Sequence, residues 1–185
     1  MKVLAIAGSL REKSYNRGLV RAARALVPSG MEIIEADISD IPLYNGDDDG
    51  DDRPAPVTAL AEQVKAADAF LFATPEYNYS IPGVLKNAID WASRKAGDEA
   101  VLAAYKNKVV GLMAASPGAL GGMRVLVVLR MLMQNLMCVV TPAQVSVAKA
   151  ADKLDEAGKL TDETAKKQLA NLASQVVSMA EKLKD

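Results

Sequence analysis

Short apolar runs alternate with amphipathic segments along the whole chain. The runs span about five to seven residues without a polar face, which is typical of strands buried on both sides of a parallel sheet. Between them, apolar residues recur every three or four positions, as in helices that cover a sheet. The predicted strands are 2–7, 31–36, 69–73, 109–115 and 137–148, the last interrupted at Pro142. The predicted helices are 16–27, 57–64, 82–92 with Ser80 as its cap, about 123–135, and one from near Thr161 to the end.

Five strands that alternate with five helices predict a doubly wound α/β sheet with right-handed crossovers. The five-stranded version of this fold is flavodoxin-like, with the parallel strand order 2-1-3-4-5. We find no internal repeat and no dividing linker, so residues 1–185 are expected to form one domain. In such sheets, ligands bind beyond the carboxyl ends of the strands where the order reverses. Here those ends belong to the first and third strands.

The composition excludes several kinds of chemistry. The chain has no histidine, which rules out imidazole acid–base catalysis, Ser-His-Asp triads and His-ligated metals. Its one cysteine, Cys138, lies in an apolar run and is predicted to be a buried core thiol; an internal disulfide or Cys-rich metal site is impossible. If the protein is an enzyme, a bound cofactor is expected to supply the reactivity.

The net charge is −1, and no apolar run approaches the ~18 residues of a membrane span. We therefore expect a cytosolic protein that binds neither nucleic acid nor membranes. Residues 2–30 nevertheless hold six basic side chains against one acidic side chain, and this basic end is where an anionic ligand is expected.

An acidic stretch at 45–52 resembles part of a calcium-binding EF-hand loop. Its twelfth position is Pro56, where an EF-hand requires a bidentate glutamate. We therefore predict no metal site and interpret the region 38–56 as a long loop whose acidic part is solvated and mobile.

The loop after the first strand, residues 8–17, carries groups suited to a phosphate. Neither the Rossmann glycine spacing nor the P-loop sequence is present. The loop instead offers the hydroxyls of Ser9 and Ser14, the amide of Asn16 and the guanidinium of Arg11. A helix begins directly after it, and helix amino ends bind anions. The alternative is an ordinary Ser/Asn-rich turn that caps the helix.

The loop after the third strand, residues 74–83, combines aromatic and polar side chains. It contains Tyr77 and Tyr79 together with Glu76 and Asn78. Alone it could be a surface turn whose tyrosines cover the end of the sheet. Together, the two loops suggest one ligand with a phosphate at the first strand and a flat heterocycle at the third.

Two segments, GSLREKSYNR at 8–17 and PEYNYSIPGVLKNAIDW at 75–91, resemble the signature loops of NAD(P)H-dependent FMN reductases. This flavodoxin-like group includes quinone, chromate and some azo-dye reductases. The resemblance extends to IPLYN at 41–45, to Ser116-Pro117-Gly118 with Gly121-Gly122, and to Leu129-Arg130. It covers nearly the whole chain to about residue 145.

The resemblance implies FMN as cofactor and assigns roles to residues of three loops. The FMN phosphate would be held by Ser9, Arg11, Ser14 and Asn16. Tyr15 lies in the same loop. The isoalloxazine ring would be lined, largely through backbone N–H groups, by Pro75, Glu76, Tyr77 and Asn78. Ser116 and Gly118 correspond to a third loop, in which Pro117 cannot donate a backbone hydrogen bond.

The activity implied is reduction of FMN by NADH or NADPH, followed by two-electron transfer to a quinone or another small acceptor in the same pocket. Such chemistry needs no catalytic side chain, because the flavin carries the reaction and solvent can supply the proton. Two alternatives stay open: a non-enzymatic electron carrier like flavodoxin, and a sensor that binds FMN without turnover.

The helix after Gly122 is apolar on every face, whereas a helix that covers one side of a sheet should keep a polar outer face. We predict that its methionine-rich outer face packs on a second copy. The resemblance agrees, since these reductases are generally dimers or dimers of dimers. The alternative is that the chain's own C-terminal segment covers this helix.

Overall fold

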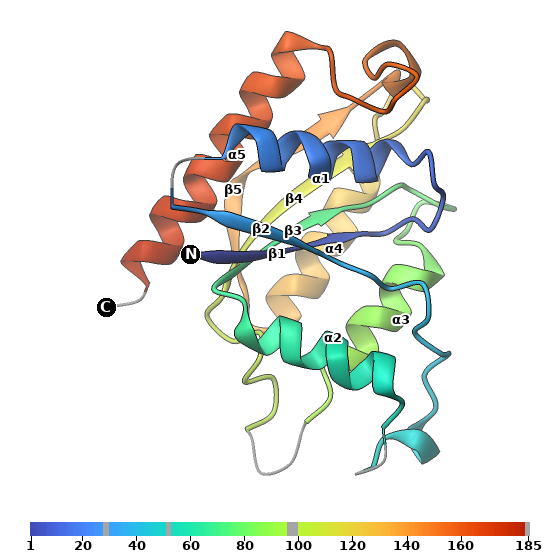
Figure 1. The fold of residues 1–185 in the computed structure, drawn as a ribbon, viewed down its shortest axis with the longest axis vertical. Coiled ribbons are helices and arrows are strands. Elements are labelled where there is room, and N and C mark those ends of the chain that lie inside the picture. Colours follow the sequence, from blue (N-terminus) through green and yellow to red (C-terminus); the bar gives the residue numbers. More distant parts are fainter. Residues whose placement is uncertain (28–29, 51–52, 96–99, 184–185) are drawn as a thin grey trace.

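The computed structural model describes residues 1–27, 30–50, 53–95 and 100–183. In that part of the chain the strands are β1 (Lys2–Ala7), β2 (Glu32–Ala36), β3 (Ala69–Ala73), β4 (Val109–Ala115) and β5 (Val139–Val147). The helices are α1 (Tyr15–Leu26), α2 (Ala55–Ala66), α3 (Gly83–Ala92), α4 (Met123–Asn135) and α5 (Glu163–Lys182), with short 3-10 helices η1 (Gly46–Asp48) and η2 (Ala150–Asp152). All strands are parallel, in the order β2-β1-β3-β4-β5, which confirms the predicted flavodoxin-like fold (Figure 1).

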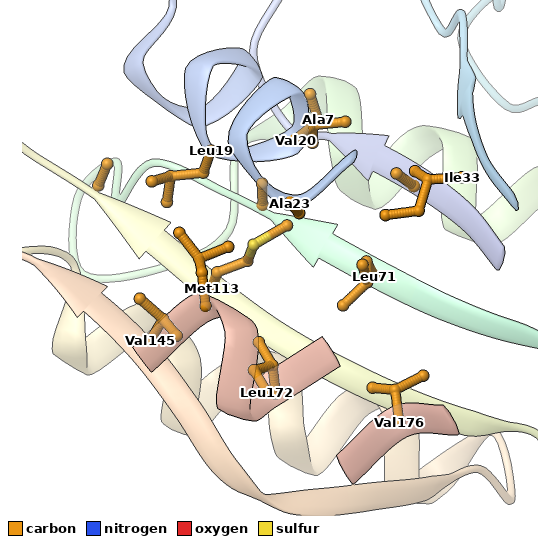
Figure 2. Packing of buried hydrophobic residues seen from close by; sticks show 14 of the residues in the cluster. Ala7, Leu19, Val20, Ala23, Ile33, Leu71, Met113, Val145, Leu172 and Val176 are labelled. Carbon is orange, nitrogen blue, oxygen red and sulfur yellow. The ribbon is translucent and has the colours of Figure 1, made fainter. Parts of the chain in front are cut away.

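The sheet has helices on both faces. One face packs on α1 and α5, and the other packs on α2, α3 and α4 (Figure 1). Figure 2 shows the first of these layers, where Leu19 of α1 and Leu172 of α5 meet Met113 of β4. Because β1, β3 and β4 are buried on both sides, their sequences are continuous apolar runs.

The predicted bounds of β1, β3 and β4 agree with the structure, whereas the predicted cap of α3 is wrong. Ser80 is not the cap of α3; the residue before the helix is Pro82, which makes no side-chain capping bond. The last helix, predicted to start near Thr161, begins at Glu163. The side chain of Asp162 accepts a hydrogen bond from the Ala165 N–H at 2.8 Å and so caps it.

The edge strand β5 passes through Pro142 without ending. Its pairing with β4 shifts register between Val110 and Leu112, whose partners are Val140 and Gln144. Pro142 lies in this bulge, where its missing N–H removes no ladder bond. The Thr141 hydroxyl lies 2.9 Å from the Ala143 carbonyl and 3.2 Å from the Val110 carbonyl, so it serves as a donor to the backbone at the bulge. The predicted interruption is therefore a bulge within one strand.

The segment between β2 and α2 is fastened to α3. The Pro42 carbonyl accepts hydrogen bonds from Asn87 Nδ2 at 2.8 Å and from Trp91 Nε1 at 2.9 Å. The Tyr44 N–H donates to Asn87 Oδ1 at 2.8 Å, and the Tyr44 ring meets Trp91 edge-on, with 4.8 Å between ring centroids. The one tryptophan of the chain is fully buried beneath this segment.

The acidic stretch is only partly solvated. Asp47 and Asp48 are exposed in η1, but the side chain of Asp49 is only 7% exposed and pairs with Arg94 at 2.5 Å and with Arg53 at 2.6 Å. Burial alone would raise the pKa of Asp49, but the hydrogen bond from Arg94 and the charge of Arg53 lower it below its usual value. The expectation of a wholly solvated, mobile loop is thus wrong for Asp49; Asp51 and Asp52 lie outside the described residues.

The described residues lack two features, a membrane-spanning helix and a cluster of metal ligands. In that part of the chain, no helix combines the length and apolar character needed to cross a membrane. The same ranges contain no group of three or more His, Cys, Asp or Glu side chains placed to hold a metal ion.

We predict that Cys138 is unreactive in the folded protein. It is buried, and its thiol donates to the Tyr105 carbonyl at 3.4 Å. Burial raises its pKa to about 12, although the charge of Lys108 opposes this, so almost no thiolate forms at pH 8. A disulfide exchange reagent should label no thiol in native protein at pH 8 and one thiol per chain in guanidinium. Stoichiometric labelling of native protein would contradict the buried position.

Candidate functional site

Three loops begin side by side at the carboxyl edge of the sheet. Each strand's hydrogen-bond ladder continues one residue past its end: Gly8 N–H donates to Ala73 O at 2.8 Å, Thr74 N–H to Met113 O at 3.0 Å and Ser116 N–H to Val147 O at 3.1 Å. The segments 9–14, 75–82 and 116–122 therefore start from one continuous row of backbone. We call them the first, second and third loops. They meet where the strand order reverses between β1 and β3, as the sequence predicts.

Glycine at position 8 permits the first and second loops to approach closely. A Cβ atom at Gly8 would lie 2.7 Å from Thr74 Oγ1 and 2.9 Å from Leu85 Cδ2. Thr74 is fully buried, and its hydroxyl donates to the Pro75 carbonyl at 3.0 Å. A larger residue at position 8 would push the first loop away from the start of the second.

The first loop ends in a helix start that can receive an anion. The Ser14 hydroxyl caps α1 by accepting from the Arg17 N–H at 3.4 Å, and the Ser9 hydroxyl accepts from the Arg11 N–H at 3.4 Å. The N–H groups of Tyr15, half-buried, and Asn16 lie in the first helical turn, where no intrahelical acceptor exists. The first turn contains no acidic residue, so positive potential is not cancelled there.

Arg11 is exposed and borders a cavity of about 810 Å³ beside this helix start. The far wall of the cavity is the segment 151–158, which begins within η2 and turns back at Gly158. The Gly158 carbonyl accepts from Arg21 Nη2 at 3.3 Å, which joins this wall to α1. The sequence did not predict that the segment 151–158 lines this cavity, because Gly158 is its only residue that indicates a turn.

The side chain of Asn16 makes hydrogen bonds within the protein. Its amide is 2% exposed; Nδ2 donates to the Ala115 carbonyl at 3.1 Å, and Oδ1 accepts from the Ala115 N–H at 2.9 Å. This pair of bonds ties the start of α1 to the end of β4, 99 residues away. The amide is committed to Ala115, and the group that Asn16 keeps for a ligand is its backbone N–H.

The second loop contains a tight two-residue turn. The N–H and carbonyl groups of Tyr77 and Ser80 exchange two hydrogen bonds of 3.0 Å, which uses the Tyr77 N–H within the protein. Asn78 and Tyr79, at the centre of the turn, have φ values of 50° and 65°. The rings of Tyr77 and Tyr79 are exposed at the edge of the sheet.

Glu76 points its side chain at α4. Its carboxylate pairs with Arg124, whose Nε donates to Oε1 at 2.6 Å, and it accepts from the Val125 N–H at 3.2 Å. The Arg124 guanidinium lies 3.8 Å from the centroid of the Tyr79 ring. Neither partner of Glu76 was predicted, because residues 48 positions apart leave no local pattern.

The third loop is supported by the segment after β5. The Ser116 hydroxyl accepts from the Gly118 N–H at 3.1 Å, and the Gly118 carbonyl accepts from the Lys149 N–H at 3.1 Å. Gly122, with φ of 80°, passes so close to β4 that a Cβ atom would lie 2.8 Å from Ala114 Cβ. Ser116 and Gly118 are thus held at the same edge as the other two loops.

Comparison with known proteins identifies the family. The profile of NADPH-dependent FMN reductases matches residues 1–152. The chain belongs to this family. It is 44% identical over 167 residues to an NAD(P)H-dependent FMN reductase of Pseudomonas aeruginosa, a match that covers 90% of this chain and 88% of that protein. It is 38% identical over 164 residues to a quinone reductase of Pseudomonas putida, covering 88% and 86% of the two chains.

A solved structure agrees with this assignment. The flavoenzyme NAD(P)H:(acceptor) oxidoreductase FerB of Paracoccus denitrificans superposes with a TM-score of 0.86 at 32% identity, over 98% of this chain and 97% of that one. The fold of this chain therefore resembles that of FerB over almost the full length of both chains.

The residues at this edge are suited to the flavin nucleotide that the family name implies. The first loop and the start of α1 combine hydroxyls, free backbone N–H groups and the Arg11 guanidinium, which suit an anion. Large apolar side chains are exposed on all three loops, at Leu10, Tyr77, Tyr79 and Leu120. Water-facing apolar side chains around one site are typical of a surface that a flat ring covers. The donor set and the apolar surface together match a phosphate joined to an aromatic ring system.

We predict that Asn16→Ala lowers stability rather than removing a ligand contact alone. The substitution leaves both backbone groups of Ala115 buried without their partners, which should reduce the free energy of unfolding by roughly 2–4 kcal/mol. Urea unfolding of flavin-free protein measures this. Ser14→Ala is the matched control and should cost about 1 kcal/mol, since it removes one helix cap. If Asn16→Ala unfolds at the same urea concentration as the wild type, the hydrogen bonds of the Asn16 amide do not contribute to stability, and the prediction is wrong.

Proposed function

We propose that this protein is an FMN-dependent oxidoreductase that takes electrons from NADH or NADPH and passes them to a quinone or another small acceptor. The observation that carries the proposal is the meeting of three loops at one edge: the first offers groups suited to a phosphate, the second exposes Tyr77 and Tyr79, and the third exposes Leu120. A cytoplasmic location is part of the proposal, because NADH and NADPH are intracellular reductants.

FMN, when bound, supplies reversible two-electron chemistry, so no side chain of the protein need act as acid, base or nucleophile. The N–H groups of Tyr15 and Asn16, the hydroxyls of Ser9 and Ser14, and Arg11 would hold the phosphate. The backbone of residues 75–78, together with Ser116 and Gly118, would orient the ring. The protein's task is then to bind, to orient and to leave one side of the ring open to both substrates.

The relatives support the substrate classes. One is named as an FMN reductase that uses NAD(P)H, and another as a quinone reductase. An electron carrier or an FMN sensor remains the alternative class of function. A carrier that docks on redox proteins is typically strongly acidic, and the net charge of −1 does not favour that role.

The direct test is turnover of the bound flavin. We expect NADPH or NADH to bleach the absorbance of bound FMN near 450 nm, and a quinone to restore it within the same sample. Because one open site serves both substrates in turn, double-reciprocal plots at several quinone concentrations should be parallel. A flavin that binds without bleaching would indicate a sensor, and intersecting plots would indicate separate sites.

We predict that Arg11→Ala weakens FMN binding without unfolding the protein. Arg11 is exposed, so its loss should leave thermal stability unchanged, whereas loss of a charge-assisted phosphate contact should cost about 1.5–3 kcal/mol of binding. Fluorescence titration of FMN should show at least a tenfold weaker affinity. Arg24→Ala, a control at the other end of α1, should bind FMN normally. Unchanged affinity in Arg11→Ala would remove Arg11 from the phosphate site.

We further propose that the protein forms a homodimer, or a dimer of dimers, through the outer face of α4. Met123, Val127 and Met131 are 48%, 65% and 66% exposed along this helix. The C-terminal helix α5 packs on the opposite face of the sheet with α1, so it does not cover them. A second copy, related by a two-fold axis, would bury the same apolar stripe on both chains.

Light scattering at micromolar concentration tests this assembly. We expect twice or four times the chain mass of 19.6 kDa. The double variant Val127→Glu/Met131→Glu should reduce the mass to that of one chain, because it places charge at the centre of the stripe. A wild-type mass near 19.6 kDa would overturn the proposed interface.

A further inference from the structure

The turn at 77–80 places a tyrosine where the backbone favours glycine. In two-residue turns of this kind both central residues have positive φ, and the usual pair is Asn-Gly. Asn78 suits the first place, but Tyr79 holds φ of 65° at the second. A bulky residue in the left-handed region is strained and persists only where its surroundings hold it there.

Arg124 contacts the Tyr79 ring. Its guanidinium stacks on the Tyr79 ring at 3.8 Å, a distance typical of a cation–π contact. The same guanidinium makes a two-point pair with the Glu76 carboxylate through Nε and Nη2. Arg124 thus contacts the second loop on both sides of Tyr77, before the turn and within it.

Glu76 fixes this arrangement to the protein core. Its side chain is only 7% exposed, and its second oxygen accepts from the Val125 N–H at 3.2 Å. Gly122, the residue before α4, has no side chain with which to cap the helix. A carboxylate from the second loop therefore takes the place of that cap, and the loop cannot shift without freeing a helix N–H group.

We infer that Arg124 is a positioning residue: it keeps the second loop in its strained turn and at a fixed place against the start of α4. Its consequence for the flavin rests on the proposed function, because the second loop is the one expected to orient the ring. The positioning itself concerns the protein alone and can be measured without flavin.

Hydrogen exchange of flavin-free protein tests the positioning. The amide hydrogens of Tyr77 and Ser80 bond within the turn, so they should be protected in the wild type. In Arg124→Met, which keeps side-chain length but removes the charge and the donors, we expect both to exchange about tenfold faster. Arg130→Met is the matched control: Arg130 lies on the same helix but donates to Thr141 O and Gln144, away from the second loop. Equal exchange in Arg124→Met and wild type would overturn the inference.

A second substitution tests whether Arg124 acts on the strained conformation of Tyr79. Glycine adopts positive φ without strain, so Tyr79→Gly should restore protection of the Tyr77 and Ser80 amides in the Arg124→Met background. Failure to restore it would show that Arg124 does not act by holding Tyr79 in its strained conformation, and would contradict the inference. Thermal unfolding of each variant identifies general destabilisation, which would expose amides throughout the sheet.

The flavin consequence is measured separately. If the proposed function holds, Arg124→Met and Glu76→Gln should each weaken FMN binding by about three- to tenfold, and the double variant should be little worse than either, because both remove one interaction. If the losses in FMN affinity of the two single variants add fully in the double variant, Arg124 and Glu76 do not act through their ion pair. A wild-type protein that binds no FMN would refute the proposed function, while the exchange result would still decide the role of Arg124.

Discussion

Parallel strand pairing is the constraint on which the rest of this structure depends. Since every strand runs the same way, every loop from a strand to the following helix starts at one edge, and the backbone ladder continues into the loops at Gly8, Thr74 and Ser116. The chain leaves β1 on one side of the sheet and β3 on the other, which opens room between the first and second loops. A helix start with free N–H groups and a turn with exposed tyrosines therefore become neighbours although about 65 residues separate them.

A few long-range polar contacts then give this edge a fixed shape. The Asn16 amide joins the start of α1, directly after the first loop, to β4, and the Glu76 carboxylate joins the second loop to α4. Both side chains are nearly buried, where an unpaired polar group is costly, so each contact strongly favours one arrangement of its loop. The loops are thus held before any ligand arrives, which lowers the entropy lost on binding.

The sequence was informative wherever a local pattern carried the information. Buried strands such as β1, β3 and β4 are uninterrupted apolar runs, and their bounds could be predicted to the residue. The two loops with unusual polar and aromatic residues could also be located. What could not be predicted were polar partners far apart in the chain: Asn16 with Ala115, Glu76 with Arg124, and Asp49 with Arg94. Such pairs form only in the folded chain, and no local sequence pattern predicts which distant residues will meet. The cap assigned to Ser80 failed for a related reason, because that residue pairs with Tyr77 in the turn.

The central claim is that the three loops form one site that binds the phosphate and the ring of FMN together. Calorimetric titration of flavin-free protein with FMN and, separately, with riboflavin tests it most directly, because the two ligands differ only in the phosphate. We expect one FMN bound per chain, and riboflavin bound at least tenfold more weakly. Equal affinities for the two flavins, or no binding of FMN, would contradict the account.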